Sequence, residues 1–125
     1  MKNSQPNGLH FIFELFGCRQ KEIDDIEFLK KVFKKSLEKS SAGILKKHFY
    51  KFNPQGVTGY VLLSASHISV HTWPEKKYAA FDVFTCSGKK ETKRIFQNII
   101  ESINHKEIKL KKIKRGFSFI DKNNG

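Results

Sequence analysis

Reactive side chains are concentrated between Ser64 and Cys86, in the sequence SASHISVHTWPEKKYAAFDVFTC. The segment combines serines, two histidines, a Trp-Pro-Glu turn and a cysteine with apolar and β-branched residues that are typical of strands. A small domain can hold reactive groups rigidly when they lie at the ends of adjacent strands. We therefore expect the chemistry of the chain to reside here.

Two kinds of chemistry fit these residues. In the first, Cys86 is the nucleophile of a thiol hydrolase, which requires an oriented histidine and an oxyanion hole; no signature of a thiol-hydrolase family surrounds this cysteine. In the second, the hydroxyl of Ser66 attacks the carbonyl of Ala65 and exchanges the amide for an ester. Removal of the Ser66 α-proton then ejects the ester and leaves dehydroalanine. Hydrolysis of that residue gives an N-terminal pyruvoyl group, which is a built-in electron sink.

Alternating and helical spacings of apolar residues predict the elements that must position these groups. Strands are expected at Leu9–Phe16, Ile44–Phe52, Gly59–Ser64, Ser66–Thr72, Tyr78–Thr85 and Ile108–Ile113, and helices at Asp24–Ser40 and from Ser87 to about Asn104. With the successive pieces Gly59–Ser64 and Ser66–Thr72 counted as one strand, the order β-α-β-β-β-α-β predicts an α+β fold, a two-layer sandwich of an antiparallel sheet with both helices on one face. The other face stays partly apolar, which favours a partner sheet across a dimer interface.

Local signals set the expected ends of the first helix. Asp24 or Asp25 can cap its start, and Gly43 suits a position just past its end. The turns between strands are expected at 53–56 and 74–77, with Ala65 marking an irregularity between two successive strands.

Length and composition limit the class of protein. The chain of 125 residues is long enough for one domain. It lacks an apolar run of about 18 residues, the length that a membrane span needs, and its first residues lack an apolar signal core. We therefore expect a cytoplasmic protein with no membrane partner. Cys18 and Cys86 have no metal-type spacing, so free thiols and no metal site are expected.

The net charge of +12 raises the hypothesis of nucleic-acid binding. The basic residues are spread along both expected helices and the C-terminal LKKIKR, and no aromatic-basic motif of an RNA-binding module is present. Solvated lysine faces are the favoured interpretation, so no nucleic-acid partner is expected. The competing hypothesis requires an affinity that falls steeply with salt.

Three collinear runs, GVTG at 56–59, SASHISVHTWPE at 64–75 and YAAFDVFTC at 78–86, resemble the small prokaryotic S-adenosylmethionine decarboxylases. The most specific part is the central run followed by FTC. The resemblance implies a pyruvoyl-dependent enzyme that decarboxylates S-adenosylmethionine and supplies aminopropyl groups for spermidine. It also implies a homodimer of cleaved protomers with sites at or near the dimer interface.

The resemblance assigns the self-cleavage to the bond between Ala65 and Ser66. Cleavage there would give a β chain of 1–65 and an α chain of 66–125, with Ser66 converted into the pyruvoyl group. The pyruvoyl carbonyl would condense with the substrate amine as a Schiff base, in the electron-sink role that pyridoxal phosphate has in other enzymes. No metal is required by this mechanism.

The resemblance also implies roles for the surrounding side chains. His71 would assist the elimination step of self-processing, and Thr58 would assist processing through its hydroxyl. Cys86 would be the general acid that reprotonates the substrate α-carbon. Glu75 would hold the ribose hydroxyls of the substrate, and Phe52 would stack on its adenine. Each residue also has an ordinary structural interpretation, as a strand residue, a buried group or a turn cap.

The chain departs from the family pattern close to the site. Ala65 stands where the family usually has glutamate, Ser87 intervenes before the glycine that usually follows FTC, and Lys77 replaces the usual glycine before the tyrosine. Two alternatives follow: a pyruvoyl-dependent ornithine or arginine decarboxylase on the same scaffold, or an unprocessed pseudoenzyme. Glu75 favours the nucleoside substrate, because an amino acid has no ribose to hold.

Overall fold

The structure is a computed structural model that describes residues 6–64 and 66–117. Its elements are β1 (Gly8–Phe16), α1 (Gln20–Ile23), α2 (Ile26–Ser36), β2 (Ile44–Lys51), β3 (Val57–Leu63), β4 (Ser66–Trp73), η1 (Pro74–Lys76), β5 (Tyr78–Thr85), α3 (Lys89–Ser102) and β6 (Glu107–Arg115). The expected strand segments and long helices occur in the expected order, but the two pieces counted as one strand are separate strands, β3 and β4, that pair antiparallel. The short helices α1 and η1 are additional. The irregularity expected at Ala65 lies outside the described residues.

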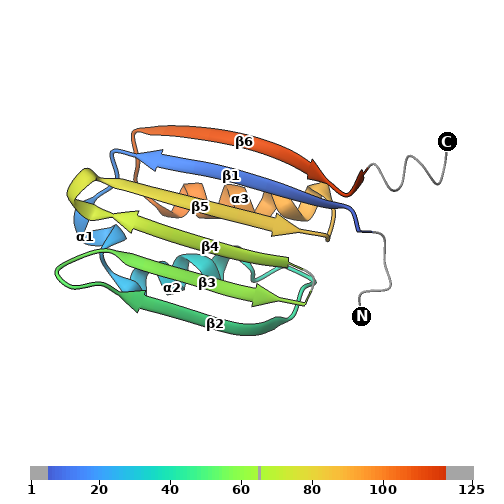
Figure 1. The fold of residues 1–125 in the computed structure, drawn as a ribbon, viewed down its shortest axis with the longest axis horizontal. Helices are drawn as coiled ribbons and strands as arrows, with labels where there is room; N and C mark the ends of the chain where they lie inside the picture. The colour runs from blue at the N-terminus through green and yellow to red at the C-terminus, as the bar shows by residue number, and fades with distance from the viewer. Residues whose placement is uncertain (1–5, 65, 118–125) are drawn as a thin grey trace.

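All six strands form one antiparallel sheet in the order β2-β3-β4-β5-β1-β6 (Figure 1). Strands β2 to β5 follow one another as hairpins. Strand β1, from the start of the chain, lies between β5 and β6. It pairs with β5 along one side and with β6 along the other, although both strands are distant from it in the sequence. The two edge strands are β2 and β6.

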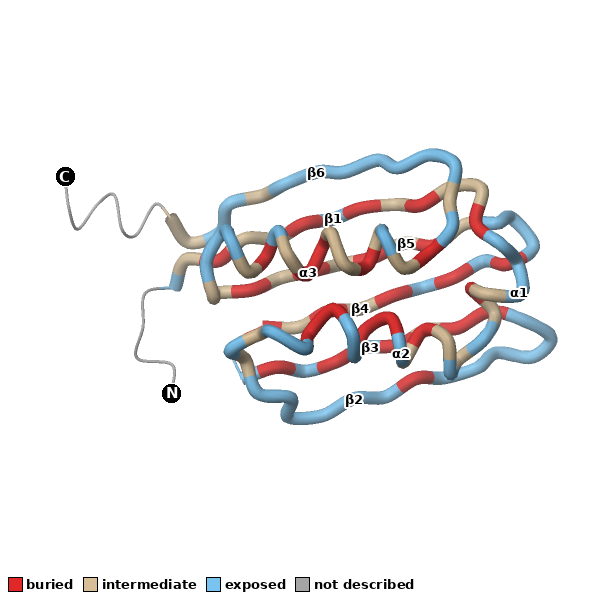
Figure 2. Tube along the Cα trace, turned by 180° about the vertical axis from the view of Figure 1, so that it is seen from behind, coloured by how far each residue is buried: buried red, intermediate tan, exposed pale blue. Residues whose placement is uncertain are grey.

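Both long helices cover the same face of the sheet, α2 over the β2 to β4 side and α3 over β5 and β1 (Figures 1 and 2). Alternation along β1 explains this layer, because Phe11, Phe13 and Leu15 point into it and are buried. The apolar stripes of the helices complete the core, with Leu29, Val32, Phe33 and Leu37 from the first segment and Ile95, Phe96, Ile99 and Ile103 from the second. The two-layer α+β fold is therefore confirmed.

The opposite face of the sheet, which we call the open face, has no helix over it in the described chain. Its strands present aromatic and aliphatic side chains that are exposed, together with polar ones. The exposed large hydrophobic residues at positions that alternate with the core are Ile12, Tyr50, Tyr60, Leu62 and Trp73. An exposed apolar surface of this kind is typical of an interaction site.

The first helix is capped by one of the two predicted residues, but it ends earlier than predicted. Asp25, and not Asp24, caps α2, because its Oδ1 accepts hydrogen bonds from the backbone N–H groups of Glu27 (2.9 Å) and Phe28 (3.2 Å). The helix ends at Ser36, well before Ser40, and Gly43 directly precedes β2 instead of following the helix end. The segment between them takes part in contacts with α3, which are described below.

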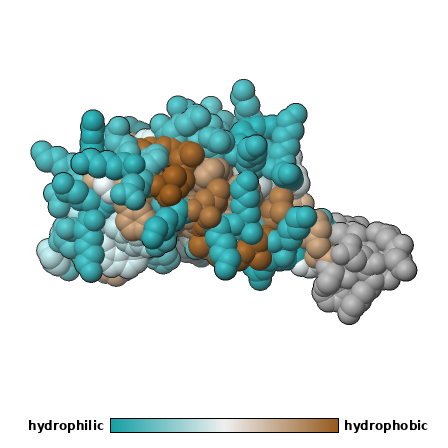
Figure 3. All heavy atoms as spheres, turned by 90° about the horizontal axis from the view of Figure 1, so that it is seen from above, coloured by the Kyte–Doolittle hydropathy of each residue, from teal (hydrophilic) through white to brown (hydrophobic). Residues whose placement is uncertain are grey.

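The edges of the sheet carry much of the positive charge. Seen from the β6 side, hydrophobic atoms lie between hydrophilic side chains (Figure 3). Strand β6 places lysines beside Ile108 and Leu110, which are 38% and 39% exposed. Lysines on an edge strand oppose pairing with a strand of another molecule.

Candidate active site

Ser66 is the first residue of β4, at the point where the chain reverses from β3. It pairs with Leu63 on one side and with Thr85 on the other. Its side chain points toward the helices and is 8% exposed. Within the described residues, its Oγ is the buried side-chain oxygen that has no hydrogen-bond partner. Because buried hydroxyls are normally paired, this unpaired oxygen needs an explanation, and a nucleophile at a chain reversal provides one.

Cys86 directly follows β5 and therefore lies at the same end of the sheet as Ser66, beside its pairing partner Thr85. Its half-buried side chain lines a cavity of about 510 Å³, which is also lined by Leu9, Phe11 and Lys112. No described histidine is hydrogen-bonded to Cys86, so the Cys/His pair that a thiol hydrolase needs is not formed within the chain.

Cys18 lies at the other end of the sheet, where its backbone N–H donates to the carbonyl of Lys77. Both cysteines are free thiols, as expected. Burial, together with the negative charge of Glu22, raises the pKa of the Cys18 thiol to about 11. A thiol with this pKa stays protonated and unreactive at neutral pH, which leaves Cys86 as the cysteine placed for chemistry.

Thr58 and His71 face each other across β3 and β4 on the open face. The Thr58 hydroxyl and Nδ1 of His71 are 3.0 Å apart, within hydrogen-bond distance. This contact orients the imidazole and leaves its other nitrogen free to exchange a proton. The two residues that the resemblance links to processing are therefore in direct contact.

Phe52 and Glu75 lie near this pair and line the same cavity of about 320 Å³, which we call the turn-end cavity. Phe52 follows β2 and is 46% exposed, so its ring is accessible for stacking. Glu75 is exposed in the short helix η1. Trp73, 41% exposed, adds a second aromatic wall. The cavity thus combines aromatic surfaces with one carboxylate, which suits a ligand with a flat ring and hydroxyl groups.

Asp24 supports this cavity from outside, a role that the sequence analysis missed. Its Oδ1 accepts a hydrogen bond from the backbone N–H of Gly56 (2.7 Å) and lies 3.0 Å from Nζ of Lys51. Burial alone would raise the pKa of Asp24, but the contacts with Gly56 and Lys51 outweigh it and lower the pKa. The available signal was the Asp24-Asp25 pair, since a helix start needs only one capping carboxylate.

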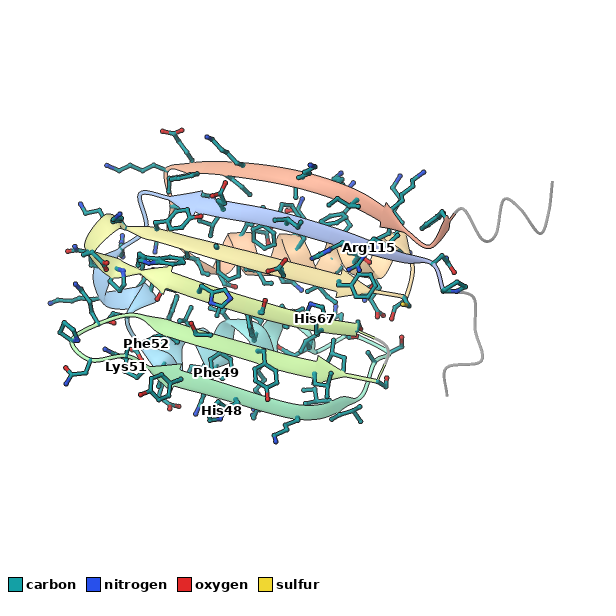
Figure 4. The ribbon with its side chains drawn as sticks, in the orientation of Figure 1. His48, Phe49, Lys51, Phe52, His67 and Arg115 are labelled. Atoms are coloured by element: carbon teal, nitrogen blue, oxygen red, sulfur yellow. The ribbon has the colours of Figure 1, made fainter. Side chains whose placement is uncertain are left out.

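The predicted site residues form two groups at opposite ends of β4. Ser66 and Cys86 lie at one end, and the turn-end cavity with His71 lies at the other. His71 lies five positions after Ser66, which is about 16 Å along an extended strand. The two side chains also point to opposite faces of the sheet. Figure 4 shows the same separation, with Phe52 and His67 at different ends.

A polar cluster occupies the open face near the Ser66 end. Nε2 of His10 is 2.9 Å from Oδ1 of Asp82, Arg115 approaches the other nitrogen of His10 at 3.4 Å, and the ring of His67 lies beside that of His10 (Figure 4). Burial, followed by the influence of His10, lowers the pKa of His67. Its contact with His10 places His67 in this polar cluster and not in the turn-end cavity.

Comparisons with known proteins indicate the same protein family as the three sequence motifs. Residues 9–116 match the protein family described as S-adenosylmethionine decarboxylase. A protein of Sulfurihydrogenibium sp. (strain YO3AOP1) named S-adenosylmethionine decarboxylase proenzyme is 42% identical, over 87% of this chain and 82% of its own length. A protein of the same name from Pyrococcus abyssi is 39% identical, over 87% of this chain and 78% of its own length.

The fold agrees with a solved structure as well. The crystal structure of the adenosylmethionine decarboxylase from Aquifex aeolicus VF5 superimposes with a TM-score of 0.83 at 34% identity, covering 90% of this chain and 93% of the other. The chain belongs to the S-adenosylmethionine decarboxylase family, which confirms the resemblance inferred from the three motifs.

Proposed function

We propose that this chain cleaves itself between Ala65 and Ser66 and then decarboxylates S-adenosylmethionine. The observation that carries the proposal is the buried, unpaired hydroxyl of Ser66 at the reversal between β3 and β4. The relatives that it resembles are named proenzymes of this activity. The turn-end cavity, with its aromatic walls and its carboxylate, supports a nucleoside substrate over ornithine or arginine.

The first step of self-cleavage moves the acyl group of Ala65 from nitrogen to oxygen. The Ser66 oxygen bonds to the Ala65 carbonyl carbon, the peptide C–N bond breaks, and the hydroxyl proton ends on the released amine. Loss of the Ser66 α-proton to a base then expels the Ala65 carboxylate. Addition of water and loss of ammonia leave a pyruvoyl group at position 66. That group supplies a carbonyl that withdraws electrons from the substrate during decarboxylation.

The side chains have separate tasks in this scheme. His71, oriented by Thr58, accepts the α-proton of Ser66 during self-cleavage. Cys86 donates a proton to the substrate carbon after CO2 has left. Glu75 accepts hydrogen bonds from the ribose, and Phe52 stacks on the adenine. None of these tasks requires a metal ion.

A homodimer is part of the proposal, because one chain holds Ser66 and His71 at opposite ends of β4. Two open faces can pack together around a two-fold axis. If that axis runs across the strands, the Ser66 end of one protomer lies against the turn-end cavity of its partner. An axis parallel to the strands would instead bring like ends together. The apolar residues of the open face support such an interface.

Mass spectrometry of freshly expressed protein tests the proposal. We expect two chains, 1–65 and 66–125, the second with a carbonyl at its N-terminus that borohydride reduces. Ser66→Ala should give one uncut chain, and the cut protein should release CO2 from S-adenosylmethionine faster than from ornithine or arginine. A single full-length chain without a reducible carbonyl would support the pseudoenzyme instead.

A further inference from the structure

The carboxylate of Glu91, in the first turn of α3, binds the loop that leads from α2 to β2. Its Oε2 accepts a hydrogen bond from the hydroxyl of Ser40 at 3.1 Å. Its Oε1 accepts two from Ser41, one from the backbone N–H at 3.1 Å and one from the hydroxyl at 3.2 Å. One half-buried carboxylate therefore determines the position of this loop, and its charge strengthens each bond.

The same loop binds the residue that precedes Ala65. The backbone N–H of Ser64 donates to the carbonyl of Gly43 at 2.9 Å, and the backbone N–H of Gly43 donates to the hydroxyl of Ser64 at 3.3 Å. Ser64 is exposed. We call Glu91, Ser40, Ser41, Gly43 and Ser64 the Glu91 clasp.

On its other side, Glu91 lies near Ser87, in the turn that carries Cys86. The hydrogen bonds from Ser41 and Ser40, with a further favourable influence of the Ser87 side chain, outweigh the effect of burial and lower the pKa of Glu91. The turn is also held by Thr85, whose hydroxyl accepts from the backbone N–H of Ser87 at 3.2 Å. Glu91 is therefore ionised at neutral pH, and its carboxylate contacts the loop at Ser40 and Ser41.

We propose that Glu91 is a positioning residue for self-cleavage, which holds the loop that binds Ser64 and so fixes the chain on the N-terminal side of the cleaved bond. The proposal rests on the proposed function, since it concerns the same bond. Transfer of an acyl group requires the attacking oxygen and the carbonyl carbon to be held about 3 Å apart in a defined orientation. Strand pairing fixes Ser66. The clasp fixes the chain on the opposite side of the bond, through Ser64.

The test compares cleavage rates of folded, initially uncut protein made by cell-free synthesis. Glu91→Ala should slow the appearance of the two chains about tenfold, the change that about 1.4 kcal/mol of lost transition-state stabilisation produces. Glu91→Gln should be intermediate, because it keeps an acceptor oxygen and loses the charge. Glu101→Gln, an exposed carboxylate on the same helix, is the matched control and should cleave at the wild-type rate.

Ser64→Ala keeps the test independent of folding, because it removes only an exposed hydroxyl. It should also slow cleavage, and combining it with Glu91→Ala should add little, as expected for two members of one network. The thermal midpoints of Glu91→Ala and Ser64→Ala are measured in the Ser66→Ala background, in which the chain stays uncut. A merely structural role would lower these midpoints, and it would give no effect on the cleavage rate beyond that loss of stability.

The outcomes separate the two proposals. A wild-type chain that stays uncut overturns both the proposed function and the clasp. A wild-type chain that is cut, with Glu91→Ala and Ser64→Ala cut equally fast, overturns the clasp alone. Slower cleavage of both variants, with Glu101→Gln unaffected and the midpoints unchanged, supports it.

Discussion

The two cysteines differ in their surroundings more than in their chemistry. Cys18 is 2% exposed and its thiol pKa is raised to about 11, whereas Cys86 is half-buried and faces a cavity. Only a thiol that reaches a ligand can donate a proton to it. The cavity, and not the residue type, distinguishes the two.

Replacement of Cys86 by alanine should therefore separate the two reactions of the chain. We expect Cys86→Ala to be cut normally, because the thiol has no part in the attack by Ser66. Its decarboxylation rate should fall about a hundredfold or more, the typical contribution of a general acid. The measurement is CO2 release by the cut protein, with Cys18→Ala as the control that keeps its rate. Equal rates for both variants would remove Cys86 from the mechanism.

His67 should make the stability depend on pH. Its pKa lies below the ordinary 6.5 because of burial and then of His10 and Arg115, which outweigh Asp82. As the pH falls below about 6.5, the unfolded chain takes up this proton first, so the free energy of unfolding should decrease. His67→Gln should flatten this decrease in denaturant titrations at pH 7.5 and 5.5, while His48→Gln, on an exposed edge, should not. A steeper fall in His67→Gln would contradict the burial effect.

At the scale of the elements, the turn between β2 and β3 depends on Asp24. The lowered pKa of this carboxylate means that its ionised form stabilises the fold, an effect present above the unfolded pKa of about 3.9 and lost as the pH falls through the folded pKa. Asp24→Asn should lower the thermal midpoint at pH 7, with a smaller difference from wild type at pH 3. It should also raise KM, because the turn carries Phe52.

Asp25→Asn is the natural control for this prediction. Asparagine caps a helix about as well as aspartate, so its midpoint should stay near that of the wild type. Equal effects of the two variants would mean that Asp24 acts only as part of the helix start.

Local patterns predicted the elements well, because each strand and helix buries one face at its own period. Alternation from Phe11 to Leu15 is an example. The end of α2 could not be predicted, since the residues that follow it are held by Glu91, which is distant in the sequence. The motifs likewise identified Thr58 and His71 but not their distance from Ser66. Which end of the sheet a residue occupies follows from pairing between strands, and spacing along the chain does not reveal it.

At the scale of the molecule, part of the +12 net charge comes from lysines on the two edge strands, β2 and β6, where they have a structural role. Edges with unpaired backbone groups attract other strands, and positive side chains oppose this. The open face carries fewer lysines and more aromatic residues. The charge distribution therefore favours association through the open face and disfavours it through β2 and β6.

Coexpression of two inactive variants tests the dimer. Ser66→Ala has no serine to process, and His71→Ala has lost the base, so each alone should remain largely unprocessed to the pyruvoyl form. In a mixed dimer, His71 of the Ser66→Ala chain meets Ser66 of the other chain. We expect the His71→Ala chain alone to be cut and to gain the carbonyl, as measured by mass spectrometry with one chain tagged. No rescue in purified mixed dimers would place both groups within one protomer.

The position of β1 between β5 and β6 has a consequence for the protein after cleavage. Residues 1–65 then provide the strand that joins two strands of residues 66–125, while β3 still pairs with β4 across the cut. The two pieces are interwoven and cannot part without breaking the sheet. Once they have separated, recovery of the fold requires an encounter between two molecules, whereas the uncut Ser66→Ala chain needs none. The renaturation yield should therefore fall on dilution far more steeply for the mature protein than for the uncut chain. After maturation, unfolding by heat or denaturant is accordingly much harder to reverse.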